Sequence, residues 1–391
     1  MTLSTFIMRI LALLCLGFFF YSCESEQNDA GNFSSSTYKL EITDSIQIDR
    51  MIGYTSIIST HPENGNLMLI AIEGDKEMIF IVSQEGEIVK EFEYPKEGPT
   101  SAGSRLMSVN FFEEGYVIMG YKNIVIYDAD FNVKKRFDIP LTINNAIYMH
   151  TKNLKVIERD GKSYFLILYA PSTQRSYTEA EYYKEFNLLT LVDPKNETFE
   201  PYGSFHEGSM FMSGKAFYFM YTFFEVVEDK TKAIVSNDTV LYTFDNAGNE
   251  LNRVSVPFDL YYIFKGYSLG EPSREEQSKV SEEPGIILGL YYVDGMDVIS
   301  YKSGFSLDIA LDLFGPNRER FDRNEVDKAN PQKVIILKDG QLVSEVLSLP
   351  EKILTLGVSD SFGNIWATQN VAALEEEPEV VTIYKLRIVE E

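Results

Sequence analysis

Cysteine is nearly absent from this sequence. Cys15 and Cys23 are the two cysteines among 391 residues, and both lie at the start of the chain. A protein cleaved before Cys23 keeps one thiol, at its first residue. The remainder of the chain therefore has no means of forming a disulfide, a cysteine metal site or a cysteine nucleophile.

Histidine and positive charge are also scarce. The three histidines, His61, His150 and His206, lie far apart, and no spacing typical of a zinc site, a phosphate loop or a nucleophile elbow occurs. Lys and Arg number 35 against 59 Asp and Glu, which gives a formal net charge of −24. So acidic a chain is unsuited to nucleic acid and to anionic lipid surfaces. We predict no metal, no cofactor and no nucleic-acid partner.

The apolar run near the start is too short to cross a membrane. It extends from Ile10 to Tyr21, directly after Arg9. About twelve residues of helix cover roughly 18 Å, whereas a membrane span needs roughly twenty residues. A basic residue, an apolar run and a small residue in this order are typical of a secretory signal, which predicts a signal peptide over residues 1–22.

The end of this segment, Phe20-Tyr21-Ser22-Cys23, resembles the lipobox of bacterial lipoproteins in the form found in the Bacteroidota. The resemblance implies lipidation of Cys23 and attachment to a membrane, which several acyl chains make stable. Glu24 and Glu26 resemble the acidic signal that sends such lipoproteins to the outer face of the outer membrane. The alternative is an ordinary signal peptide that a cysteine happens to follow.

Two further regions follow the predicted cleavage site. Residues 23–37 are rich in Asn, Asp, Gly and Ser and predict a lipidated, flexible tether. Residues 38–391 predict a single domain, in which apolar and polar residues alternate between turn residues and amphipathic helical patterns are scarce. Phe and Tyr, 27 and 24 residues against one Trp, suit the half-buried surfaces of strands. These patterns predict an all-β fold.

One unit recurs along this domain. It consists of a strand, a second strand that ends in a tight turn, and a third strand, and each turn contains a residue that tolerates positive φ. The six copies lie within residues 65–92, 115–137, 164–196, 233–248, 298–340 and 363–386.

The copies resemble six-bladed β-propellers of the NHL and TolB-like kind, in which Gly-Asn precedes one strand and Asp-x-x-Gly follows another. Together with the lipobox, they resemble the propeller lipoproteins of the Bacteroidota. The resemblance implies a six-bladed β-propeller, with seven blades as the alternative. The last copy ends after its third strand, and the strand from Tyr38 to Ile48 belongs to no copy. We expect these two ends to pair, which would complete the last blade and remove an exposed edge.

Long segments between the copies contain the candidate binding residues. Arg318, Arg320 and Arg323, with Asp322, lie in the segment 303–332. Guanidinium groups bind carboxylates and sulfates through paired hydrogen bonds, so this segment predicts a site for an anionic glycan or peptide. The alternative is a solvated loop or short helix whose charges pair with one another. His206 is the histidine we single out, with a loop histidine held by hydrogen bonds as the alternative.

Three short motifs resemble sites of other kinds. The segment Asp128–Asn132 opens like a calcium loop but lacks its glycine and final glutamate, so we interpret it as a hairpin turn. Asp44-Ser45-Ile46 and Asp238-Thr239-Val240 resemble the O-glycosylation site of the Bacteroidota, which implies modification of Ser45 and Thr239.

The sequence favours a binding or scaffolding module that is anchored in the outer membrane and faces the cell surface, with a glycan, a peptide or an envelope protein as its ligand. A carbohydrate-active hydrolase or lyase with carboxylates at the central channel is the alternative, because 59 acidic residues can supply a carboxylate pair across blades. The TolB-like resemblance implies a third possibility, a periplasm-facing partner of an envelope complex. The fold does not choose among them, so the question of catalysis stays open.

Overall fold

The computed structural model describes residues 37–50, 53, 55–140, 152, 154–168, 175–176, 178–217, 220–269, 280–374, 376 and 378–391. Within this part of the chain, Thr37–Glu391 form one compact unit. The predicted signal peptide, Cys23, Glu24 and Glu26 lie outside the described residues. None of the helices in the described ranges combines the length and the apolar character that a membrane crossing requires.

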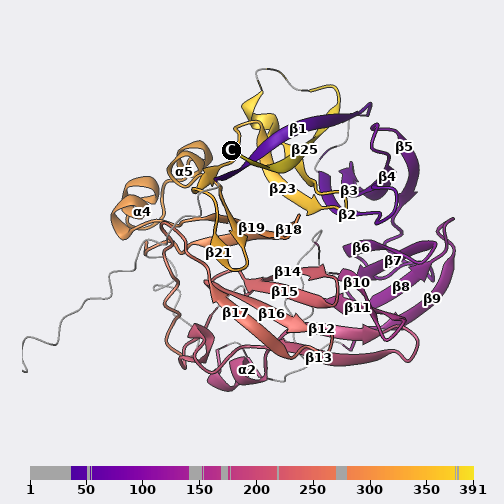
Figure 1. Cartoon of the computed structure of the whole chain (residues 1–391), viewed down its shortest axis with the longest axis horizontal. Helices are drawn as coiled ribbons and strands as arrows, with labels where there is room; N and C mark the ends of the chain where they lie inside the picture. The colour runs from indigo at the N-terminus through magenta and orange to yellow at the C-terminus, as the bar shows by residue number, and fades with distance from the viewer. Residues whose placement is uncertain are drawn as a thin grey trace, which may run out of the picture. The chain divides into compact units, whose positions relative to one another are not determined.

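Six antiparallel sheets make up this unit, and they are arranged as the six blades of a β-propeller (Figure 1). Five sheets have four strands, and the sheet that begins with β18 has a fifth. Blade 1 consists of β2 (Thr55–Thr60), β3 (Leu67–Glu73), β4 (Lys76–Val82) and β5 (Ile88–Glu93). Blade 2 consists of β6 (Leu106–Phe112), β7 (Gly115–Gly120), β8 (Asn123–Tyr127) and β9 (Val133–Asp138). Blade 3 consists of β10 (Leu154–Arg159), β11 (Lys162–Ile167), β12 (Asn187–Asp193) and β13 (Thr198–Ser204). Blade 4 consists of β14 (Thr222–Val227), β15 (Lys230–Val235), β16 (Val240–Asp245) and β17 (Glu250–Ser255). Blade 5 consists of β18 (Ile286–Val293), β19 (Met296–Lys302), β20 (Lys333–Lys338), β21 (Gln341–Leu342) and β22 (Leu347–Ser348). Blade 6 consists of β23 (Ile353–Ser359), β24 (Ile365–Gln369), β25 (Val381–Glu390) and β1 (Tyr38–Ile48).

The burial of each strand follows its position in the blade. In blade 1 the middle strands are nearly continuous apolar runs, and the five residues Leu67–Ala71 of β3 are all buried. The outermost strand β5, by contrast, alternates half-buried and exposed residues along Ile88–Glu93. A middle strand packs against neighbouring blades on both faces and therefore needs apolar residues throughout. An outer strand needs them on one face only.

The Asp-containing turns are held by the aspartate side chain. In the turn from Asp128 to Asn132, the Asp128 carboxylate accepts hydrogen bonds from the backbone N–H groups of Asp130 and Asn132, at 2.8 and 2.9 Å. Phe131 takes a φ of 58° in this turn. Asp245 and Asp360 close equivalent turns, each with an Asn four residues on. Asp128 thus closes the β8–β9 hairpin, as we interpreted the motif.

The predicted ring closure is confirmed. β1 pairs with β25 in antiparallel register, from Tyr38 opposite Glu390 to Ile48 opposite Val381 (Figure 1). The first described strand is therefore the outermost strand of the last blade, and it covers the edge that β25 would otherwise expose.

Short helices lie between strands of two blades. The helix α2 (Ala180–Glu185) lies between β11 and β12, and the segment 303–332 contains α4 (Leu307–Phe314) and α5 (Arg323–Ala329). Two 3₁₀ turns, η1 (Met210–Met212) and η2 (Val371–Ala373), complete the elements. The segment 303–332 is therefore a helical insertion that follows β19.

Candidate ligand cavity

The first strands of the six blades form a ring. Each contacts the first strand of the next blade, in the order β2, β6, β10, β14, β18, β23 and back to β2. The copies that the sequence revealed begin at the second strand of each blade, so this inner ring was missed. These strands are as long as the others, but their side chains face unlike surroundings, which hides the two-residue alternation that identified the other strands.

A cavity of about 580 Å³ lies inside this ring. Its volume falls in the range of about 300–1,000 Å³ that is usual for small-molecule sites. Apolar side chains and hydroxyl groups dominate the lining, and among the described lining residues Lys152 is the one with a formal charge. The lining residues are Thr55, Ser56, Ile57, Ile58, Lys152, Tyr221, Thr222, Phe223, Phe224, Ser236, Ile286, Ile287, Leu288, Leu290, Leu354, Thr355, Leu356, Gly357 and Thr368.

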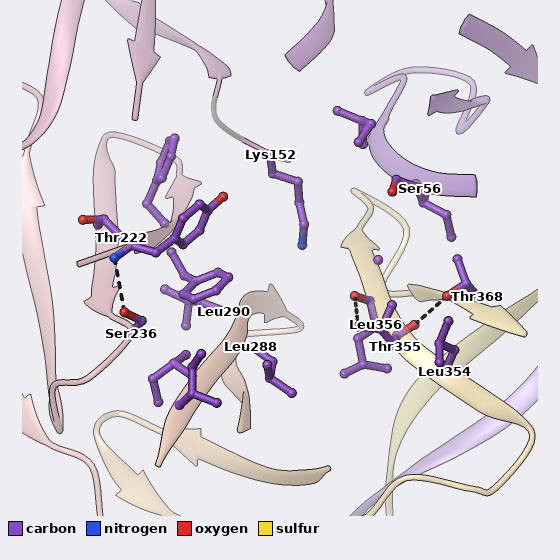
Figure 2. Close-up of a pocket in the computed structure, with 18 of the residues that line it drawn as sticks. Ser56, Lys152, Thr222, Ser236, Leu288, Leu290, Leu354, Thr355, Leu356 and Thr368 are labelled. Atoms are coloured by element: carbon purple, nitrogen blue, oxygen red, sulfur yellow. Dashed lines mark hydrogen bonds between the residues drawn. The ribbon is translucent and has the colours of Figure 1, made fainter. Parts of the chain in front are cut away.

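Lys152 extends into this cavity from the chain that precedes β10. Figure 2 shows its amine between two walls, one with Leu288 and Leu290 from β18 and the other with Ser56 and Thr368 from β2 and β24. The Lys152 side chain is half-buried, and its exposed part lines the cavity. The surrounding protein removes the amine from bulk water, and this desolvation lowers the pKa of Lys152 to about 7.

The Lys152 amine has one close aromatic neighbour. Its Nζ lies 4.3 Å from the centre of the Tyr291 ring. The Tyr291 hydroxyl is directed elsewhere and donates a hydrogen bond to the Leu356 carbonyl at 2.7 Å. Within the described ranges, no hydrogen bond or ion pair joins Lys152 to another residue. The ring face favours a cation, but it offers no lone pair to the ammonium hydrogens.

A buried ion pair lies beside Lys152 at the junction of blades 3 and 4. Lys155 on β10 and Glu225 on β14 are 2.7 Å apart, and their side chains are 18% and 7% exposed. The second carboxylate oxygen of Glu225 has no hydrogen-bond partner. The charge of Glu225 acts to raise the pKa of Lys152, whereas that of Lys155 acts to lower it. Two lysines thus share one carboxylate, and the carboxylate is bound to Lys155.

The predicted arginine cluster lies away from this cavity, on the helical insertion. Arg318 pairs with Glu283, and its guanidinium lies 5.5 Å from the centre of the Phe314 ring. Arg320 donates to the carbonyl of Leu311 at 3.1 Å.

The two remaining residues of the cluster belong to α5. Asp322 is its N-cap and accepts from the backbone N–H of Asn324 at 2.9 Å. Arg323 lies 3.6 Å from Asp327 one helical turn on, and its side chain is 77% exposed. Each of the four side chains therefore has a partner within the insertion or at Glu283. A ligand would have to displace these contacts.

His206 lies at the junction of blades 3 and 4. Its Nδ1 is 2.9 Å from the hydroxyl of the buried Tyr242, and that hydroxyl is 3.4 Å from a carboxylate oxygen of Asp238. Burial lowers the pKa of His206 and raises the pKa of Asp238 to about 6. Neither His206 nor Asp238 lines the cavity. The described geometry matches a loop histidine held by hydrogen bonds.

The two predicted glycosylation residues differ in exposure. Ser45 lies on the exposed part of the edge strand β1, whereas Thr239 is half-buried and follows the buried Asp238. Across the described ranges, no group of three or more His, Cys, Asp or Glu side chains is placed to hold a metal ion.

No protein-family model and no curated protein matches the sequence. Among solved structures, the chain is similar to a member of the DUF4221 family from Bacteroides vulgatus, with a TM-score of 0.65 and 10% identity over 92% of this chain and 100% of that one. It is also similar to a putative exported protein from Bacteroides fragilis, with a TM-score of 0.53 and 10% identity over 90% of this chain and 95% of that one. At this level of identity the likeness shows the six-bladed propeller fold.

Proposed function

We propose that this chain is an exported, lipid-anchored propeller that acts as a binding module, with the cavity inside its ring of first strands as the ligand site. The observation that supports this most is the cavity itself, which combines an apolar lining, several hydroxyl groups and one amine that has no polar partner among the described residues. A mostly apolar concave site with a few polar groups is what small ligands generally occupy.

The cavity offers little support for the alternative, a carbohydrate-active hydrolase or lyase. Such enzymes need two carboxyl groups across the scissile bond, and the lining residues within the described part of the chain include no Asp or Glu. Asp238 and Asp297 are buried carboxyl groups with raised pKa, but Asp238 is hydrogen-bonded near His206 and Asp297 is paired with Lys232 at 2.7 Å. Neither lines the cavity.

Blocking the cavity tests the binding site. Leu288 lines the cavity, so Leu288→Trp fills it, whereas Val89→Trp adds the same bulk at an exposed position of β5. Native mass spectrometry after incubation with a small-molecule extract of bacterial envelopes should show a bound mass on the wild type and on Val89→Trp, and none on Leu288→Trp. Equal retention by all three proteins would contradict the assignment of the cavity.

The anchor has a separate test. We propose that Cys23 carries lipid and that Glu24 and Glu26 direct the chain to the cell surface, on the basis of the motif around Cys23. Cys23→Ala should abolish labelling with radioactive fatty acid and release the chain from the membrane fraction. Protease added to intact cells should degrade the wild type, and resistance to it would favour the periplasm-facing alternative.

A further inference from the structure

We propose that the ligand of the central cavity is a small organic acid with one carboxylate, which pairs with the Lys152 amine, and an apolar body, which packs against the leucines of β18 and β23. The inference rests on the proposed binding function and adds to it the charge and the chemical class of the ligand. It depends on how charge, polarity and space are distributed around Lys152.

The charges around Lys152 leave one positive charge to be matched. Lys155 and Glu225 form a pair at 2.7 Å, and Lys152 has an aromatic ring as its nearest neighbour. Of the lining residues that the structure describes, Lys152 is the one that carries a charge. A buried charge is costly unless an opposite charge or hydrogen-bond acceptors meet it, and a carboxylate supplies both. One lysine matches one negative charge, so a monoanion fits better than a doubly charged phosphate ester.

The walls on either side of Lys152 select the remainder of the ligand. Leu288 and Leu290 come from β18, and Leu354 and Leu356 come from β23. Figure 2 shows the amine between the wall with Leu288 and Leu290 and the wall with Leu354 and Leu356. An acid whose body is apolar therefore places its carboxylate at the amine and its body among the leucines. The volume of about 580 Å³ accommodates an acid of about a dozen heavy atoms with room to spare.

The hydroxyl groups of one wall are available as secondary donors. Ser56 and Thr368 lie on the side of the cavity opposite Leu290 (Figure 2). The Thr368 hydroxyl is 3.5 Å from the Thr355 carbonyl, which is the limit of a hydrogen bond and leaves it easily redirected. These hydroxyl groups line the same cavity as the amine and can donate to a polar group of the ligand.

Binding of an acid at this amine should depend on pH. The groups that face Lys152 are Tyr291 on β18, Tyr221 before β14, and the Lys155–Glu225 pair; β2 and β23 contribute apolar and hydroxyl side chains to the lining. Burial raises the pKa of Tyr291, which stays neutral near pH 7. The Lys152 amine has a pKa of about 7, so it is mostly charged at pH 6 and mostly neutral at pH 8. Since the charged form binds the anion, the dissociation constant should rise by about 10-fold from pH 6 to pH 8.

The test uses three probes that share a phenylpropyl skeleton and differ in the charge of the terminal group: 3-phenylpropionate, 3-phenylpropanol and 3-phenylpropylamine. Calorimetric titration of the purified full chain at pH 6 should show binding of the acid at least about 10-fold tighter than of the alcohol, with the amine weakest. Lys152→Met should weaken binding of the acid by about 10- to 100-fold, in line with the loss of a charged hydrogen bond. It should leave binding of the alcohol unchanged.

Lys152→Arg makes the test independent of any loss of folding. A guanidinium stays charged throughout this pH range, so the variant should retain the preference for the acid and lose the pH dependence. Lys134→Gln, at an exposed lysine of β9, is the control and should behave as the wild type. Thermal denaturation of each variant verifies that it is folded.

Two results would overturn the inference. Equal binding of the acid and the alcohol, blocked by Leu288→Trp in both cases, would leave the cavity as the ligand site and remove the role of Lys152. Binding of none of the probes would also refute the acid, whereas the proposed function would still be judged by the envelope extract and the Leu288→Trp variant. The two proposals therefore fail on different measurements.

Discussion

At the scale of single residues, the candidate site depends on positions that look ordinary in the sequence. Lys152 lies in Thr151-Lys152-Asn153-Leu154-Lys155, where nothing separates one lysine from the other. In the folded chain Lys155 pairs with Glu225, 70 positions away. The Lys152 amine lies over the Tyr291 ring, which is still further along the chain. Partners so distant in sequence leave no local signal. The arginines around Arg320, by contrast, are conspicuous in sequence but pair within their own insertion.

The Lys155–Glu225 pair should be important for stability as well as for the charge of the cavity. Glu225→Gln keeps the shape of the side chain but leaves Lys155, whose side chain is 18% exposed, without its partner charge. Removing one partner of a buried pair costs about 3–5 kcal/mol, which chemical denaturation should show as a large fall in the free energy of unfolding. Lys134→Gln breaks an exposed pair with Glu113 and should cost about 0.5 kcal/mol or less. Equal effects of the two substitutions would show that the Lys155–Glu225 contact is not buried in solution.

Asp238 should make stability depend on pH in a known direction. Burial raises its pKa to about 6 in the folded chain, whereas an unfolded aspartate titrates near about 3.9. Between roughly pH 4 and 6 the folded state therefore binds more protons than the unfolded state, and stability contributed by this group falls as pH rises. Asp238→Asn stays neutral, so it should be about 2–3 kcal/mol more stable than the wild type at pH 7.5, and close to it at pH 4.

Thermal or chemical unfolding across this pH range measures the difference. Asp44→Asn, on the exposed edge strand β1, is the surface control and should run parallel to the wild type. A pH profile of Asp238→Asn that also runs parallel to the wild type would argue against the buried, proton-retaining carboxyl.

At the scale of elements, the sequence predicted what depends on near neighbours. Hairpin turns such as Asp245–Asn249 are built from their own residues, so a residue that tolerates positive φ, here Gly248, identified them. Middle strands such as β3 can be predicted from their unbroken runs of apolar residues. The ring of first strands was missed because β10 and β14 pack around the axis, and their alternation reflects several different neighbours at once. The cavity is formed by the very strands that local pattern failed to identify.

The pairing of β1 with β25 can be tested by a disulfide. Glu41 lies opposite Arg387 in the register, and both are exposed. In a chain that carries Cys15→Ala and Cys23→Ala, the pair Glu41→Cys and Arg387→Cys should form a disulfide on mild oxidation, because the sequence then has no other thiol. The bond should raise the melting temperature, and a reductant should reverse the rise.

A mismatched pair provides the control for register. Glu41→Cys with Leu386→Cys places the second thiol on the opposite face of β25, since neighbouring residues of a strand point to opposite faces. This pair should remain reduced under the same conditions. Efficient bonding of the mismatched pair, or failure of the matched one, would show that the ends of the chain do not close the ring as described.

At the scale of the whole molecule, the sequence predicts an anchor and the structure shows a propeller. The copies in the sequence were enough to predict six blades and their closure, because each blade repeats the same strand and turn chemistry. The ligand site could not be predicted from the sequence, because the cavity is lined by residues as far apart as Thr55 and Thr368, each of which contributes one side chain. The proposed position of the ligand therefore follows from the ring of first strands, and its proposed chemical class follows from Lys152.

The most direct test of this account is a crystal structure of the protein with the ligand that it retains from an envelope extract. The account predicts ligand density inside the ring of first strands, with an acidic group at the Lys152 amine and the apolar part against Leu288 and Leu356. Density located instead on the helical insertion around Arg318 and Arg320, with the central cavity filled by solvent, would contradict it.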